Sequence, residues 1–72
     1  MTARDAAILE GIRTATAAWN APQDTVYYAE KWDINPGAML KTLTRLYEAG
    51  KLERGRVTRY GGYVYVWSVK DG

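Results

Sequence analysis

The hydrophobic pattern of this 72-residue chain changes its period at Gly50, and this change constrains the fold more than any other feature. Before Gly50 the apolar residues recur at spacings of three and four, which is typical of amphipathic helices. After Gly50 they alternate at a spacing of two, which is typical of strands. The sequence therefore predicts helices followed by a β-hairpin, an α+β fold that is mainly α. The length suits a single domain over residues 1–72.

The helical part contains signals for three helices and for the breaks between them. Pro22 interrupts the first pattern, because proline has no backbone N–H to donate inside a helix. Asn35 and Pro36 mark the start of the third helix, since an asparagine side chain can accept from a free backbone N–H and proline suits the first helical position. Gly50 ends that helix by adopting a left-handed conformation. The expected helices cover residues from about 3 to 19, about 25 to 32 and about 36 to 49, the first capped by Thr2 or Asp5 and the second by Asp24 or Thr25.

The three helices are expected to form a bundle around one apolar core. In the third helix Met39, Leu43 and Leu46 fall on one side of a helical wheel, with Leu40 and Tyr47 at the edge of this stripe. The other two helices contribute apolar residues at helical spacing. These are Ile8, Leu9, Ile12, Ala15, Thr16 and Trp19 in the first helix and Val26, Tyr28, Ala29 and Trp32 in the second.

The C-terminal part predicts a hairpin over residues from about 52 to 69 with its turn at Gly61-Gly62. Two glycines suit a type I′ turn, because both of its central residues need positive φ. With this turn Thr58 faces Tyr65 and Val57 faces Val66. One side of the hairpin, with Leu52, Tyr63, Tyr65, Trp67 and Val69, is expected to pack on the helices. The other side, with Val57, Val64 and Val66, is expected to be partly exposed.

The amino-acid composition excludes several classes of function. The chain has no cysteine and no histidine, which removes disulfides, zinc fingers, thiol nucleophiles and imidazole bases. Its acidic residues are scattered, and the YGGY segment lacks the strand–loop–helix context and the lysine of a phosphate-binding loop. We therefore expect no enzyme activity, no cofactor and no metal. No apolar run is long enough to span a membrane and the start of the chain is too polar for a signal peptide, so we expect a cytoplasmic protein without membrane contact.

Charge is distributed unevenly along the chain. Residues 1–35 carry three basic and five acidic side chains, whereas residues 36–72 carry seven basic and three acidic ones. The third helix places Ala38, Lys41 and Arg45 opposite its apolar stripe. Small residues allow close approach to the major groove of DNA, and basic residues reach bases or phosphates there. This pattern favours a polyanionic partner, while for the helix taken alone a solvated polar face is the simpler alternative.

The segment TVYYAEKWDINPGAMLKTLTRLYEAGKLERG resembles the helix-turn-helix core of winged-helix transcriptional regulators. Tyr28-Ala29 matches the apolar and small residues of the first motif helix, where the small residue lets the two helices cross closely. Asn35-Pro36 matches the capped start of the family's recognition helix. The resemblance covers residues 25–69 and implies a winged helix-turn-helix fold in which the hairpin is the wing.

Two positions depart from the family pattern. At Asp33 the family often has glycine, and we expect a left-handed backbone there because aspartate tolerates it better than most residues. At Leu40 the family often has a polar residue that contacts bases. The leucine either touches a thymine methyl group or faces a protein partner.

The resemblance implies that the protein binds double-stranded DNA and regulates transcription. In this family the recognition helix enters the major groove, and the wing lies along the backbone or in a minor groove. Arginines on the hairpin fit this role because a narrow minor groove attracts them, although they could instead protect an edge strand from aggregation. The residues expected to contact DNA, as one positive surface, are Asn35, Ala38, Lys41, Thr42 and Arg45 from the helix and Arg54, Arg56, Arg59 and Tyr60 from the hairpin.

The sequence leaves two other kinds of partner open. A winged-helix module that binds protein would use Leu40, Tyr47 and the valine side of the hairpin, since a fold does not dictate a function. The same valine side is a candidate homodimer contact, or simply an apolar strand of a small protein. A single small DNA-binding module is expected to dimerise or to bind cooperatively, because it contacts few base pairs.

Overall fold

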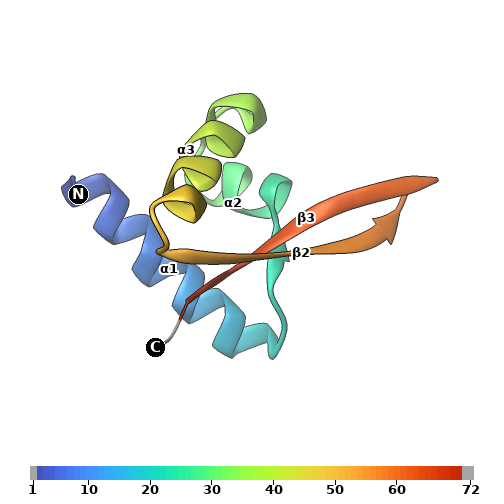
Figure 1. Ribbon diagram of the computed structural model, residues 1–72, viewed down its shortest axis with the longest axis horizontal. Helices are drawn as coiled ribbons and strands as arrows, with labels where there is room; N and C mark the ends of the chain where they lie inside the picture. The colour runs from blue at the N-terminus through green and yellow to red at the C-terminus, as the bar shows by residue number, and fades with distance from the viewer. Residues whose placement is uncertain (1, 71–72) are drawn as a thin grey trace.

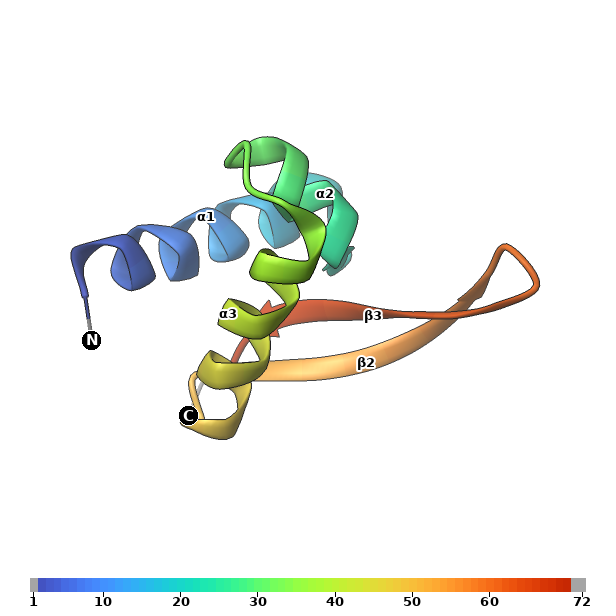
Figure 2. The same ribbon diagram turned by 90° about the horizontal axis from the view of Figure 1, so that it is seen from above.

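A computed structural model describes residues 2–70 and contains three helices and one antiparallel sheet of three strands (Figure 1). The expected α+β fold with mainly helical content is confirmed. The order of elements along the chain is α1 (Ala3–Trp19), β1 (Gln23–Asp24), α2 (Thr25–Lys31), α3 (Pro36–Glu48), β2 (Leu52–Arg59) and β3 (Gly62–Val69). The three helices lie together, and the β2–β3 hairpin projects away from them (Figure 2).

Local side-chain contacts begin each helix where the sequence predicts. Thr2, not Asp5, caps α1, with the backbone N–H of Asp5 donating to the threonine hydroxyl at 3.1 Å. Asp24 caps α2 by accepting from the backbone N–H of Tyr27 at 2.9 Å. Asn35 caps α3 by accepting from the backbone N–H of Gly37 at 2.8 Å. Each cap satisfies a donor that the helix itself leaves unpaired.

The turns on either side of α3 also follow the prediction. Asp33 has a positive φ of 52° in the turn between α2 and α3. Pro36 occupies the start of α3, and Gly50 follows its end with a φ of 79°. Glycine adopts this left-handed conformation without steric cost, so the chain can leave the helix and enter β2.

Strand β1 is not expected from the sequence, which indicates only a break between helices in this region. This strand is two residues long and pairs antiparallel with β3, Gln23 opposite Trp67 and Asp24 opposite Val66. The strand order is β1-β3-β2, so β3 is the central strand. Two residues are too few to produce an alternating pattern, and only the pairing with β3 defines this strand.

The predicted register of the hairpin is wrong by two residues. The turn consists of Tyr60 and Gly61, whose φ angles are 56° and 77°, instead of Gly61 and Gly62. In the observed register Leu52 pairs with Val69, and both contribute to the packing against the helices. A shift by two leaves every side chain on its predicted side of the sheet, because the side-chain period of a strand is two.

The core is formed by all three helices and the base of the hairpin. Trp67 lies fully buried at its centre, where its indole N–H donates to the hydroxyl of Thr25 at 2.9 Å. The phenol of Tyr28 is also buried and donates to the carbonyl oxygen of Trp67 at 3.4 Å. The buried members of the core are Ile8, Ile12, Ala15, Tyr28, Ala29, Met39, Leu43, Leu46, Leu52 and Trp67.

Two residues expected in the core are exposed, and one residue expected to be exposed is buried. Trp19, the last residue of α1, is 62% exposed, and its indole N–H donates to the hydroxyl of Tyr27 at 3.2 Å. Val26 is 51% exposed in the first turn of α2, beside an open hollow. Val66 is buried instead of exposed, since β1 pairs with β3 at this position.

Trp32 is half-buried and packs against α1, as expected. Its ring lies over Gly11, where a Cβ atom added to the glycine would come within 2.1 Å of Trp32 Cη2. The glycine in the middle of α1 therefore provides the space for this ring. Within residues 2–70, no helix is both long and apolar enough to cross a membrane.

Candidate nucleic-acid interface

The side of α3 that carries Leu40 and Tyr47 lies next to strand β3 of the hairpin. Tyr47 of α3 meets Trp67 of β3 edge to face, with ring centroids 6.4 Å apart and planes at 74°. Nearer the start of α3, Leu40 is 40% exposed and lines an open hollow of about 320 Å³ together with Tyr63, Val64 and Tyr65 of β3. The two elements therefore meet at the base of the hairpin, and Asp24, Thr25 and Val26 complete the lining of the hollow.

Two arginines of β2 lie on the side of the hairpin that carries these aromatic rings. The guanidinium carbon of Arg54 lies over the ring of Tyr47, 4.4 Å from its centroid, and over that of Tyr65 at 4.3 Å. Arg56 lies over the ring of Tyr63 at 5.1 Å. Cation–π attraction holds each guanidinium on this surface without neutralising its charge.

The rings of β3 form a continuous row behind the arginines. Tyr63 and Tyr65 meet edge to face at 5.5 Å, and Tyr65 lies 6.0 Å from Trp67. Hydrogen bonding with Tyr65, and next with Arg56, lowers the pKa of the Tyr63 phenol below its ordinary value. The row links the exposed part of the hairpin to the buried indole of Trp67.

Lys41, Arg54 and Arg56 keep an uncompensated positive charge. In the part of the chain that the structure describes, none of them forms an ion pair with a carboxylate. All three are exposed. Exposed cations without a carboxylate partner on α3 and on the adjoining hairpin favour the approach of a polyanion.

Arg45, another predicted contact, pairs with a carboxylate of α1. Its guanidinium donates two hydrogen bonds to Asp5, at 2.8 and 3.0 Å. The Asp5 side chain is buried, whereas 59% of the Arg45 side chain remains exposed. Hydrogen bonding from Arg45 holds the pKa of Asp5 below its ordinary value. The pair ties α3 to the first turn of α1, on the side of α3 away from Tyr47 and the hairpin.

Arg59 likewise pairs with a carboxylate, on the opposite side of the sheet from Arg54 and Arg56. Its guanidinium donates to the second carboxylate oxygen of Asp24, the residue that caps α2. Asp24 and Arg59 share the side of the sheet that carries Val64 and Val66. The expected single positive surface is therefore divided, because Arg45 and Arg59 are paired with acidic groups on two other sides of the molecule.

The remaining predicted contacts occupy different environments. The side-chain oxygen of Asn35 serves as the cap of α3. Ala38 is exposed, and Thr42 is half-buried. Tyr60 is 95% exposed at the tip of the hairpin. Of these four, Ala38 and Tyr60 offer a free side chain to a partner.

The aromatic partners of the arginines are not expected from the sequence. Helical spacing indicates Tyr47 only as an apolar contact, and strand alternation indicates Tyr63 and Tyr65 only as core residues. The sequence does contain one signal for these contacts. Arginines recur at every second position of β2 and tyrosines at every second position of β3, and residues paired across an antiparallel hairpin lie on the same side. Arg56 is paired with Tyr65, and Thr58 is paired with Tyr63.

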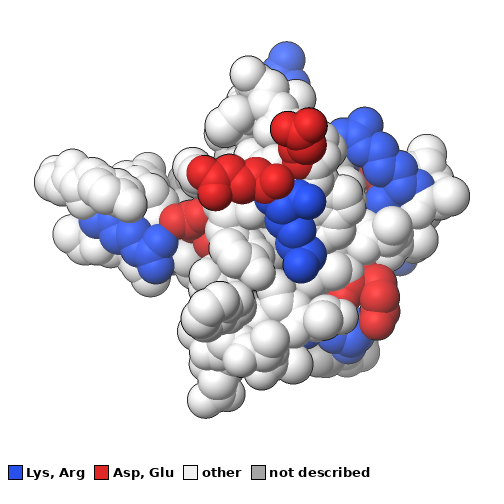
Figure 3. All heavy atoms as spheres, turned by 180° about the vertical axis from the view of Figure 1, so that it is seen from behind, with Lys and Arg blue, Asp and Glu red and all other residues white. Residues whose placement is uncertain are grey.

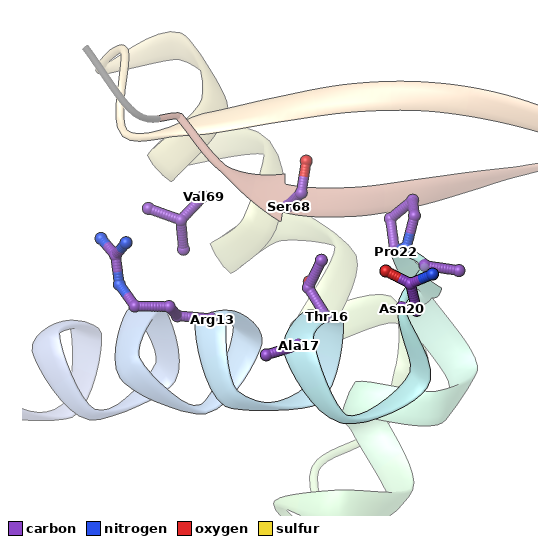
Figure 4. Close-up of a pocket in the computed structure, with 8 residues that line it drawn as sticks. Arg13, Thr16, Ala17, Asn20, Pro22, Ser68 and Val69 are labelled. Carbon is purple, nitrogen blue, oxygen red and sulfur yellow. The ribbon is translucent and has the colours of Figure 1, made fainter.

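The other surfaces of the molecule are weaker candidates for a binding site than the surface formed by α3 and the hairpin. A hollow of about 400 Å³ lies between α1 and the end of β3, with Thr16, Asn20 and Ser68 as its uncharged polar groups (Figure 4). Within the described residues, the charged side chain that lines this hollow is that of Arg13. Basic and acidic side chains are interspersed on the face opposite to that of Figure 1 (Figure 3). Among residues 2–70, no group of three or more acidic side chains is placed to hold a metal ion.

Comparison with known proteins adds no further constraint. The chain matches no protein-family model, no curated protein and no solved structure. Any function must therefore be argued from the arrangement of its own side chains, and the surface formed by α3 and the aromatic side of the hairpin is the strongest candidate.

Proposed function

We propose that this protein is a winged helix-turn-helix domain that binds double-stranded DNA and acts as a small transcriptional regulator. The observation that carries the proposal is the placement of Lys41, Arg54 and Arg56. These unpaired cations lie on the exposed side of α3 and on the aromatic side of the adjoining hairpin. A helix beside a basic hairpin presents two elements to a duplex, one for a groove and one for the backbone.

The order of elements supports the same proposal. A short α2, a tight turn with Asp33 in a left-handed conformation, and an Asn-capped α3 match what the sequence resemblance implies for a helix-turn-helix. Packing of Met39, Leu43 and Leu46 in the core leaves the opposite side of α3 available to a groove. Leu40, beside that side, is suited to a thymine methyl group.

The experiment is a titration of fluorescent random-sequence duplex at two salt concentrations. We expect binding that weakens with salt, with log K falling by about 0.9 for each phosphate neutralised and a total slope of about −2 to −3 for three cations. The double variant Lys41→Gln with Arg56→Gln should bind weakly and with a smaller slope. Absence of binding at low salt would reject the proposal.

A control with the same change in net charge separates a defined surface from general attraction. Lys31, at the end of α2, and Lys70, after β3, are exposed and lie outside the surface formed by α3 and the aromatic side of the hairpin. The double variant Lys31→Gln with Lys70→Gln should retain most of the affinity. Equal losses in the two double variants would mean that binding depends on net charge alone, and the assignment of the surface would be withdrawn.

The second candidate is a winged-helix module that binds protein. It is favoured by the exposure of Leu40, Val26 and Tyr63 around the hollow of about 320 Å³. Burial of Val66 and the contact of Tyr47 with Trp67 reduce the apolar surface on which this candidate depends. Capture of a protein partner that is lost with Leu40→Asp and retained with Arg56→Gln would favour it over DNA binding.

A further inference from the structure

Arg54 lies where α3 and the hairpin meet, and rings from both elements hold it there. Its guanidinium carbon is 4.4 Å from the ring centroid of Tyr47 in α3 and 4.3 Å from that of Tyr65 in β3. Trp67, at 6.0 Å, lies behind these rings. Because Trp67 is fully buried and hydrogen-bonded to Thr25, this aromatic support is anchored in the core.

The ring contacts leave the hydrogen-bond donors of Arg54 available. A guanidinium carries five N–H groups in one plane. No hydrogen bond or ion pair joins them to an acceptor within residues 2–70. Arg45 and Arg59, by contrast, direct their donors to Asp5 and Asp24. Within residues 2–70, Arg54 is thus held in position by aromatic rings but is not paired with an anionic group.

The charge and the planar donor geometry of the Arg54 guanidinium determine which ligand it binds best. A planar fork of N–H donors matches two oxygens of a phosphate, and paired charge-assisted hydrogen bonds of this kind are both strong and directional. A side chain that is already positioned loses less conformational freedom on binding. A lysine at this place would carry the same charge but could not make the same paired contact.

We propose that Arg54 binds one phosphate of the duplex backbone with two hydrogen bonds and sets the position of α3 relative to the hairpin on DNA. This inference rests on the proposed function. Phosphate contacts fix the register of a protein on a duplex without selecting its sequence. Arg54 is placed for this role because it contacts both elements that would approach the DNA.

The test compares Arg54→Lys with Arg56→Lys by titration of one fluorescent duplex, chosen by selection from a random pool. Both variants keep the net charge, and both residues lie on the same side of β2. Arg54→Lys should weaken binding about tenfold through the loss of a charge-assisted hydrogen bond, while Arg56→Lys should weaken it about twofold or less. Tyr47→Leu, which removes one supporting ring and no charge, should weaken binding several-fold.

Substituted duplexes provide a readout that a purely structural role would not change. Single phosphates are replaced in turn by neutral methylphosphonates. The wild-type protein should lose affinity mainly when one particular phosphate is replaced. Arg54→Lys, which already lacks the paired contact, should lose little further affinity when that same phosphate is replaced. Melting curves confirm that each variant is folded.

The outcomes separate this inference from the function on which it rests. If the wild-type protein binds no duplex, the proposed function itself fails. If it binds duplex and Arg54→Lys behaves like Arg56→Lys, DNA binding stands and the role of Arg54 is overturned. A methylphosphonate profile identical for the wild-type protein and Arg54→Lys would also overturn it.

Discussion

Replacing Gly11 with alanine tests the packing that orients α2 against α1. A Cβ atom at this position would lie 2.1 Å from Cη2 and 2.5 Å from Cζ2 of Trp32. Carbon atoms normally approach to about 3.5–4.0 Å, so the indole ring would have to move by about 1.5 Å or more. The substitution thus sets a gain in helix propensity against the loss of a packed ring.

The two effects have comparable sizes. Alanine favours a helix interior over glycine by about 1 kcal/mol. A tryptophan side chain buries about 150–250 Å² when it is packed. If displacement of the half-buried Trp32 ring exposes about 100 Å², the loss at about 25 cal/mol per Å² is about 2.5 kcal/mol. We therefore expect Gly11→Ala to lower the free energy of unfolding by about 1.5 kcal/mol, which corresponds to a fall in Tm of about 6–12 °C for a domain of this size.

Thermal and urea denaturation followed by circular dichroism measure this change. In the background of Trp32→Ala the clash is absent, and Gly11→Ala should instead stabilise the protein by about 1 kcal/mol. Ala7, exposed in the same helix, provides the matched control, since Ala7→Gly reports helix propensity alone. Stabilisation by Gly11→Ala in the wild-type background would refute the packing argument.

Two further predictions concern stability. Because Arg45 lowers the pKa of Asp5 in the folded protein, the pair stabilises the fold above the unfolded-state pKa, and this contribution should disappear as the pH falls below about 4. Urea midpoints of the wild-type protein and Asp5→Asn should accordingly differ at pH 7 and converge in acid, and a difference independent of pH would contradict this. Tyr60→Asn places an Asn-Gly pair in the type I′ turn, and asparagine tolerates a positive φ better than tyrosine does. This variant should therefore raise the free energy of unfolding by about 0.5–1 kcal/mol in urea titrations. A lowered urea midpoint would contradict the idea that Tyr60 is strained at its positive φ.

Features with local causes could be predicted from the sequence. The N-caps Asp24 and Asn35 act on backbone groups two or three residues away. The apolar stripe of α3 follows from helical spacing, and Met39, Leu43 and Leu46 are buried as expected. The hairpin has both strands and the correct sides, because these depend only on alternation.

Features that depend on distant residues could not be predicted. Asp5 and Arg45 are 40 residues apart, and nothing in the sequence relates their side chains. The glycine pair predicts a turn at Gly61-Gly62, whereas the observed turn lies one residue earlier and keeps every side chain on the same side. The observed turn gives tyrosine a positive φ and sets Leu52 opposite Val69 in the core. Packing at the base of the hairpin therefore outweighs the local preference at its tip.

Because β1 covers only two residues of β3, the sheet changes width along its length. It has three strands beside the helices and only two toward the tip. We expect backbone amides in the three-stranded part to be strongly protected from hydrogen exchange, and those in the two-stranded part toward the tip to exchange much faster. A rigid three-stranded base with a more flexible two-stranded outer part would let the hairpin follow the curvature of a bound surface while the helical body keeps its shape.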